Sequence, residues 1–152
     1  GMSNGGFMSQ LLACEASDVF AAVAPVTGTL GIPAADCNPG RGVPILQFYG
    51  TEDPLVAFVS EEPELDAVRS FAAWGEINGC SGEVEETFRT EGAYCERHTG
   101  CADDAPTEWC VLEGMGHCWP GQTDLCPFGN TTDAIDANER MWEFFSANIL
   151  ED

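Results

Sequence analysis

The chain has 152 residues, of which 44% are hydrophobic, and this length and composition suit the core of one domain. Its 26 acidic residues against five arginines and no lysine give a formal net charge of −21. Nucleic acids and anionic membranes are bound through clustered lysine and arginine, so neither is expected as a partner.

The chain begins with GMSNG, which matches the G-x-S-x-G motif of serine hydrolases and has Ser3 at the nucleophile position. In that motif the serine lies on a strained turn between a strand and a helix. Its glycines are expected because the turn brings backbone segments too close for a Cβ atom. A short, buried, apolar helix is predicted over residues 6–18. Residues 19–28 are a nearly continuous apolar run, which predicts a parallel strand covered on both faces.

The middle of the chain predicts three more elements. A buried strand is expected over residues 43–50, and a helix over residues 63–78 that Gly79 is placed to end. Residues 83–90 alternate in polarity like a half-exposed strand. The cysteine- and glycine-rich residues 92–106 predict a loop with short extended pieces.

A further strand, over residues 108–116, and a final helix, over residues 132–148, complete the predicted elements. Thr132 is a plausible N-cap of that helix. The apolar residues on its predicted buried face are Ile135, Met141, Trp142, Phe145 and Ile149. Strands that alternate with helices and include buried runs indicate an α/β fold with a mainly parallel sheet.

Three residues have the order and placement needed to activate a serine. A serine hydroxyl is a weak nucleophile unless a base removes its proton and a carboxylate orients that base. In hydrolases with the G-x-S-x-G motif the order is serine, acid, histidine, with the acid and the histidine on loops after strands. Asp53 follows strand 43–50 and His117 follows strand 108–116. We therefore expect Ser3, Asp53 and His117 to form a catalytic triad.

Other interpretations of these residues remain open from the residues alone. Asp53 could be a turn former before Pro54, and the adjacent Glu52 could be the acid. Glu52 should point away if Asp53 faces the site. His98 is the only other histidine, but it lies among closely spaced cysteines in a predicted loop, where a surface position is expected.

The cysteine content predicts disulfides formed in an oxidising compartment. The eight cysteines are Cys14, Cys37, Cys80, Cys95, Cys101, Cys110, Cys118 and Cys126. Zinc is the competing interpretation, because Cys95, His98, Cys101 and Cys110 loosely resemble a ligand set. The other cysteines have no such partners, so neither a metal nor a cofactor is expected.

The acidity has two possible explanations. Adaptation to salty water is favoured, since salt screens the self-repulsion of a charged surface. A calcium-binding surface is the alternative, but no D-x-D-x-D-G loop is present.

The motifs together resemble the secreted polyhydroxybutyrate depolymerase-like esterases of the α/β-hydrolase fold, which include feruloyl and acetylxylan esterase relatives. The matching stretches are GMSNGGFMSQLLACEASDVFAAVAPVTG, VPILQFYGTEDPLV, WGEINGCSGE and GMGHCWPG. The resemblance covers nearly the whole chain, and the family's triad corresponds to Ser3, Asp53 and His117. The family's His-x-Trp-Pro-Gly signature usually has threonine at x, where this chain has Cys118.

The resemblance implies an α/β-hydrolase fold, with a mostly parallel sheet and flanking helices. It implies that the backbone amide of Asn4 donates to the oxyanion. Met2 and Trp119 are expected beside the substrate, and the alternative for Trp119 is that it only packs the loop. Phe128 and Trp74 are expected in the core. Sequence proximity and the family together favour the disulfides Cys14–Cys37, Cys80–Cys101, Cys95–Cys110 and Cys118–Cys126, the last of which would brace the loop that carries His117.

In that family about half of the fold precedes the serine, including an HG-type loop that completes the oxyanion hole. Residues 1–152 therefore resemble the carboxyl-terminal portion of one catalytic domain whose amino-terminal half is missing. Little or no ester hydrolysis is expected from residues 1–152 alone. The resemblance also implies a secreted protein, extracellular or periplasmic.

The expected function is that of a serine carboxylic-ester hydrolase working through an acyl-enzyme. Polyhydroxyalkanoates and feruloylated or acetylated polysaccharides suit the triad equally, and the sequence favours no oligomeric state. One alternative is a peptidase of the same fold. Another is a non-catalytic binding module held together by disulfides.

Overall fold

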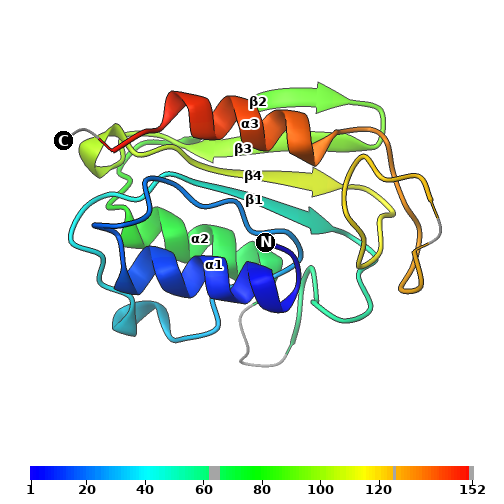
Figure 1. The fold of residues 1–152 in the computed structure, drawn as a ribbon, viewed down its shortest axis with the longest axis horizontal. Coiled ribbons are helices and arrows are strands. Elements are labelled where there is room, and N and C mark those ends of the chain that lie inside the picture. The colour runs from blue at the N-terminus through cyan, green and yellow to red at the C-terminus, as the bar shows by residue number, and fades with distance from the viewer. Residues whose placement is uncertain (62–65, 125, 151–152) are drawn as a thin grey trace.

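A computed structural model describes residues 1–61, 66–124 and 126–150. A four-stranded sheet lies between helices (Figure 1). The strands, in the spatial order β1-β4-β3-β2, are β1 (Ile45–Gly50), β4 (Thr107–Leu112), β3 (Ala93–His98) and β2 (Val84–Thr90). The helices are α1 (Asn4–Glu15) and α2 (Ala67–Ile77) on one face and α3 (Ala137–Ala147) on the other. Short 3-10 turns occur at Ala34–Asp36 and Ala102–Asp104. Within the described residues, no helix has the length and apolar character needed to cross a membrane.

The sheet is mixed, so the prediction of a mainly parallel sheet is wrong for its four strands. β1 and β4 are parallel, whereas β3 is antiparallel to both β4 and β2. β3 occupies part of the segment predicted as a loop, where the glycines and cysteines obscure the alternation of a strand. Gly92, with φ 81°, turns the chain back between β2 and β3, and the register places Cys95 opposite Cys110. β2 is exposed along almost its whole length rather than half-exposed.

Residues 19–28 do not form the predicted continuous strand, but part of this segment is extended alongside β1. Val23 and Val26 form isolated parallel bridges with Ile45 and Phe48. Pro25 interrupts the ladder because it has no N–H group, although its carbonyl accepts a hydrogen bond from the Phe48 amide at 3.0 Å. The segment therefore lies next to β1 on the side where Ser3 is found.

The core follows from the alternation of side chains in β1, because successive residues of a strand point to opposite faces. Leu46 and Phe48 pack in one cluster with Met141 of α3. Ile45 packs in a second cluster with Trp74 of α2, and Trp74 is fully buried as predicted. β1 is buried on both faces over its whole length, as its apolar sequence predicts.

All three helices begin at a different residue from the one predicted. α1 spans Asn4–Glu15 rather than residues 6–18. The N-cap of α3 is Asp136, whose side chain accepts a hydrogen bond from the Asn138 amide at 2.8 Å, so the prediction of Thr132 as N-cap is wrong. Only the side of α3 that faces the sheet is covered, and Trp142, predicted as buried, is 74% exposed. α2 begins at Ala67, and the start predicted at Pro63 lies outside the described residues.

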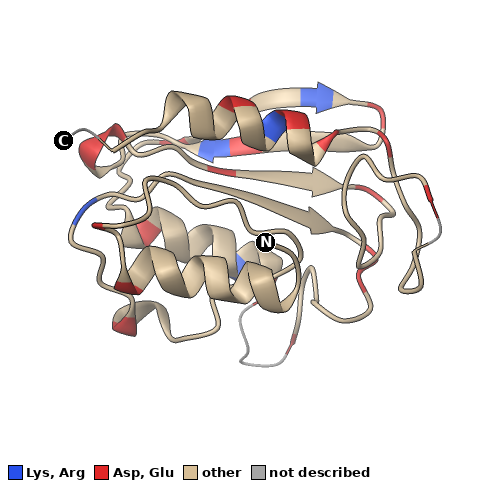
Figure 2. Ribbon diagram, viewed as in Figure 1, with Lys and Arg blue, Asp and Glu red and all other residues tan. Residues whose placement is uncertain are grey.

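Figure 2 shows the acidic residues spread over most elements of the fold rather than gathered at one end.

The turn around Ser3 is tight, but not at every glycine of the motif. A Cβ atom at Gly1 would lie 2.8 Å from the Gly5 carbonyl oxygen, whereas one at Gly5 would meet nothing within 4 Å. The next glycine lies equally close to another segment: a Cβ at Gly6 would lie 2.8 Å from the Val26 carbonyl oxygen and 3.1 Å from the Cα of Gly28. The expectation that Gly5 is needed for close approach is therefore wrong, and Gly6 has that role.

Replacing Gly6 with alanine is expected to lower the free energy of unfolding by about 1–3 kcal/mol, because the added methyl must displace backbone. Gly5→Ala is the matched control, one residue away in the same helix, and should raise stability by about 0.4–1 kcal/mol by restricting the unfolded chain. Urea unfolding of both variants provides the measurement. Equal effects of the two substitutions would contradict the difference in packing.

Candidate active site

Ser3 lies at the junction between an extended segment and α1. Its amide donates a hydrogen bond to the Val26 carbonyl at 2.9 Å, and its carbonyl accepts one from the Phe7 amide at 2.9 Å. Ser3 has φ 54° and ψ −120°, a positive φ that is uncommon for a residue other than glycine. The backbone therefore holds Ser3 in a strained conformation, which is typical of functional sites.

Asp53 and His117 form a buried pair. The Nδ1 atom of His117 lies 2.8 Å from Oδ2 of Asp53, and the two side chains are only 4% and 2% exposed. The other carboxylate oxygen of Asp53 accepts hydrogen bonds from the amides of Leu55 at 2.8 Å and Val56 at 2.9 Å. A carboxylate can only accept, so Nδ1 donates and Nε2 of the ring is left as an acceptor.

The parallel pairing of β1 with β4 brings these two residues together, because the carboxyl ends of parallel strands meet at the same edge of a sheet. Beyond the strands, the Thr51 amide donates to the Leu112 carbonyl and the Glu52 amide to the Met115 carbonyl, both at 3.0 Å. Gly50 permits this contact, since a Cβ there would lie 2.1 Å from the Met115 carbonyl oxygen.

The segment that carries His117 is fastened to a second segment. The His117 amide donates to the Phe128 carbonyl at 3.0 Å, and the Gly116 amide donates to the Asn130 carbonyl at 2.9 Å. A disulfide joins Cys118 to Cys126 across the same two segments. These contacts fix the backbone on which the imidazole is carried.

Ser3 and His117 line one pocket of about 420 Å³. Met2 and Trp119, both expected beside a substrate, also line it. Within the described residues no hydrogen bond joins the Ser3 hydroxyl to the imidazole, a bond that in unliganded enzymes is often long and tightens only with substrate. The Asn4 amide is the first of α1 and therefore has no acceptor within the helix.

The predictions for Glu52 and Phe128, two residues near the site, have different outcomes. Glu52 is exposed, and its Oε2 atom lies 3.5 Å from the side-chain nitrogen of Asn130, so its carboxylate is not in the Asp53–His117 pair. The prediction that Phe128 belongs to the core is wrong: it is 49% exposed and lines the pocket, with its ring edge-on to His117 at 6.3 Å between centroids.

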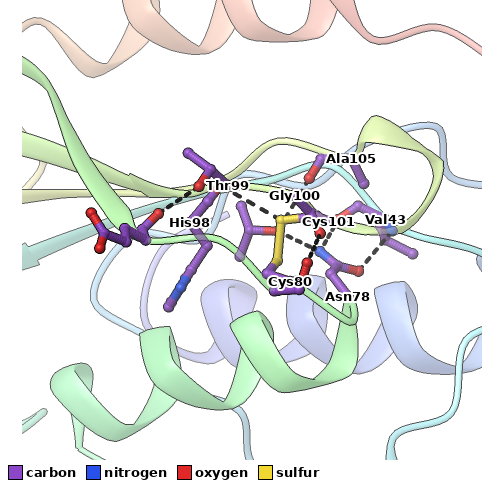
Figure 3. The surroundings of a disulfide bond; sticks show 11 residues. Val43, Asn78, Cys80, His98, Thr99, Gly100, Cys101 and Ala105 are labelled. Atoms are coloured by element: carbon purple, nitrogen blue, oxygen red, sulfur yellow. Dashed lines mark hydrogen bonds between the residues drawn. A yellow bond between two sulfur atoms is a disulfide. The ribbon is translucent and has the colours of Figure 1, made fainter.

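The prediction that His98 is a surface residue of a loop is wrong. His98 is the last residue of β3. Its ring packs at 4.2 Å between centroids from Phe71 of α2. Burial lowers the pKa of His98, although a hydrogen bond involving the Phe71 backbone opposes this. Figure 3 shows the side chain near the Cys80–Cys101 disulfide and directed toward α2. Its Nε2 atom is buried without a hydrogen-bond partner in the described part of the chain, and His98 does not line the pocket that contains Ser3.

All eight cysteines form disulfides. The bonds are Cys14–Cys37, Cys80–Cys101, Cys95–Cys110 and Cys118–Cys126, the pairs implied by the family resemblance and sequence proximity. The zinc interpretation fails, because a zinc site needs thiolates and the sulfur atoms of Cys95, Cys101 and Cys110 are already bonded to other sulfur atoms.

Sequence reasoning missed several residues around the site. The amides that hold Asp53 belong to Leu55 and Val56, and the sequence carries a signal for this, because aspartate before proline commonly bonds to backbone two residues on. Gln122, Pro127 and Thr131 also line the pocket. No sequence signal identifies them, since they approach the pocket only through the folding of the segment after His117.

Comparison with known proteins finds esterases among the relatives of this chain. It is 35% identical over 129 residues to feruloyl esterase B of Piromyces equi, an alignment that covers 77% of this chain and 24% of that protein. It is 32% identical over 145 residues to the protein named "Putative esterase NocK" of Nocardia uniformis subsp. tsuyamanensis, covering 81% of this chain and 42% of that protein. No protein-family model matches the chain.

The chain thus spans less than half the length of each of these two relatives. Within the chain itself the similarity extends over most of the residues. The helix-flanked sheet of the chain is consistent with the α/β-hydrolase fold that its esterase homologues imply. The chain is homologous to these two proteins over about four fifths of its own length.

Proposed function

We propose that this chain carries the nucleophile, base and acid of a serine carboxylic-ester hydrolase, namely Ser3, His117 and Asp53. The observation that supports this most strongly is the buried 2.8 Å contact between Asp53 and His117, beside a pocket that Ser3 lines from a strained turn. The acid is hydrogen bonded to the base, and the base lines the same pocket as the nucleophile, as these roles require. The esterase names of the two homologues support the same reaction class.

In the proposed reaction, the Ser3 hydroxyl oxygen attacks the ester carbonyl carbon while Nε2 of His117 removes its proton. Asp53 holds the ring and stabilises the imidazolium that forms. The negative charge on the carbonyl oxygen is stabilised by the Asn4 amide at the positive end of α1. The bond between the acyl carbon and the alcohol oxygen then breaks, and the alcohol leaves with the proton from His117.

An acyl group is then attached to Ser3, and water completes the cycle. His117 removes a proton from the water as its oxygen attacks the acyl carbon, and then returns that proton to Ser3 as the carboxylic acid leaves. Apart from His117, no described residue that lines the pocket has an ionisable side chain, which favours an uncharged ester. Met2 and Trp119 are proposed to contact it.

For the substrate we propose an acetyl or feruloyl ester of a polysaccharide, or a polyhydroxyalkanoate, hydrolysed outside the cytoplasm. Disulfides are typical of oxidising compartments, which supports this location. A peptidase of the same fold would use the same three groups, but both homologues carry esterase names, feruloyl esterase B and "Putative esterase NocK".

Fluorophosphonate labelling tests the proposal against a non-catalytic binding module, because only an activated serine reacts with this probe. The protein should be expressed with whatever residues its gene encodes on either side of the chain. We expect the probe to attach at Ser3, as located by peptide mapping. Labelling should be lost in Ser3→Ala and in His117→Ala, since the second variant keeps the hydroxyl but removes its base. An unlabelled native protein, or labelling that persists in His117→Ala, would contradict the triad.

A further inference from the structure

A second cavity lies beside the pocket that contains Ser3. It has a volume of about 640 Å³, within the range of small-molecule sites. Its walls come from α1, the segment 29–34 and the segment 55–60. Leu55 lines both this cavity and the pocket of Ser3 and His117. Leu55 therefore forms part of the wall that the cavity and the Ser3 pocket share.

The backbone fixes this cavity in place relative to the proposed catalytic groups. The Leu55 amide is hydrogen bonded at 2.8 Å to the carboxylate of Asp53. On the opposite wall, the amide of Phe7 is hydrogen bonded at 2.9 Å to the carbonyl of Ser3. Leu55 is itself 59% exposed, so a ligand can contact its side chain. A molecule that reacts at Ser3 can therefore extend over Leu55 into the second cavity.

The lining identifies the chemistry that this cavity can accept. Most of the side chains are apolar, among them Phe7, Leu30, Ile32 and Val56, and the polar ones are the hydroxyl-bearing Thr29 and Ser60. No residue of the described lining carries a charge. The formal net charge of −21 further disfavours anionic ligands. An uncharged apolar chain fits these properties, because the apolar side chains of the lining offer a sugar few hydrogen-bond partners.

We propose that this cavity is a second substrate subsite, which binds an extended, uncharged, apolar chain on one side of the scissile ester. The other side of the ester then lies in the pocket lined by Trp119 and Phe128. The inference rests on the proposed function and narrows its substrate class: the preferred ester has an apolar extension long enough to cross Leu55. Short acetyl esters of small alcohols fill only the first pocket.

Binding to Ser3→Ala tests the subsite without hydrolysis. Two ester series are compared, one lengthened on the acyl side (acetyl, butyryl, hexanoyl, octanoyl) and one lengthened on the alcohol side. In one series Kd should fall by up to about fourfold for each added methylene that is buried. Which series responds reveals the side of the ester that enters the cavity. Flat Kd values in both series would overturn the proposal.

Variants that fill the cavity locate the effect. Ala57 lines the cavity and is exposed, so Ala57→Phe in the Ser3→Ala background should reduce the dependence of Kd on chain length. Ala72→Phe is the matched control, because Ala72 is exposed on α2 and lines neither space. Gly31→Leu fills the cavity from the opposite wall, where a Cβ would make an ordinary 3.6 Å contact with the Phe7 ring. An unchanged length dependence in both filling variants would overturn the assignment.

These outcomes separate the subsite from the proposed function. Chain-length-dependent binding in a protein that never hydrolyses an ester would refute the hydrolase and leave the apolar site standing. If the protein hydrolyses esters and the dependence on ester chain length is unchanged in Ala57→Phe and Gly31→Leu, the subsite is refuted and the proposed hydrolase activity is retained.

Discussion

Ser3→Ala is expected to lower the rate of ester hydrolysis by about 10⁴- to 10⁶-fold, the loss typical of removing a serine nucleophile. The reason is that the substitution removes the atom that attacks the ester, while the contact between Asp53 and His117 stays intact. The measurement is kcat and kcat/KM for a nitrophenyl ester, with the protein expressed together with the residues that its gene encodes on either side of the chain. Because Ser3 makes no side-chain hydrogen bond in the described structure, the free energy of unfolding should change little, and urea unfolding checks this.

Ser9→Ala is the matched control for this prediction. Ser9 lies in α1, the helix that Ser3 precedes, and its hydroxyl donates to the Gly5 carbonyl of the same helix at 2.7 Å. We expect near-normal turnover in this variant. Ester hydrolysis that survives in Ser3→Ala would show that the activity comes from a different nucleophile and would end the proposal.

Asp53→Asn should lower kcat by about 10⁴-fold, as it does for the equivalent acid of serine proteases. The reason lies in the three hydrogen bonds that Asp53 accepts, two from backbone amides and one from His117. In the asparagine variant the amide oxygen retains the two backbone donors, so its NH₂ group faces Nδ1 of His117. Nδ1 must then become an acceptor, Nε2 carries the proton, and the ring can no longer accept the proton of Ser3.

Glu52→Gln provides the comparison for this second prediction. It is the same chemical change on the adjacent residue, whose exposed carboxylate lies near Asn130 rather than His117. Its kcat should remain within a few-fold of the parent value. A large loss of kcat in Glu52→Gln together with a small loss in Asp53→Asn would show that Glu52, and not Asp53, is the acid. Comparable losses in both would indicate that general charge, rather than the tautomer of His117, determines the rate.

Much of the fold and of the candidate site could be predicted from the sequence. The apolar run of β1 predicts a buried strand, and the position of Asp53 just after this run predicts that Asp53 lies at the carboxyl end of the strand. His117 was similarly placed by the strand before it. Disulfides between cysteines close in sequence, such as Cys118–Cys126, could also be predicted, because few residues separate the two partners.

Other features could not be predicted, because they depend on contacts between distant segments. The strand β3 is held by pairing on both sides, so its local composition of glycine and cysteine indicated a loop. Trp142 occupies a helical position that would be buried if α3 were covered more widely, yet only one side of α3 meets the sheet. The G-x-S-x-G motif includes Gly5 and not Gly6, and only the approach of Val26 and Gly28 in the folded chain makes Gly6 the critical one.

By itself, the sequence determined which chemical groups are available and where they fall relative to the strands, because hydrophobic periodicity and turn residues act locally. Only the tertiary structure decided which groups meet. Asp53 and His117 are 64 residues apart and touch because β1 and β4 pair in parallel with a fixed register. The same pairing, together with the turn that leads into α1, places Leu55 between two cavities that belong to no single segment of the chain.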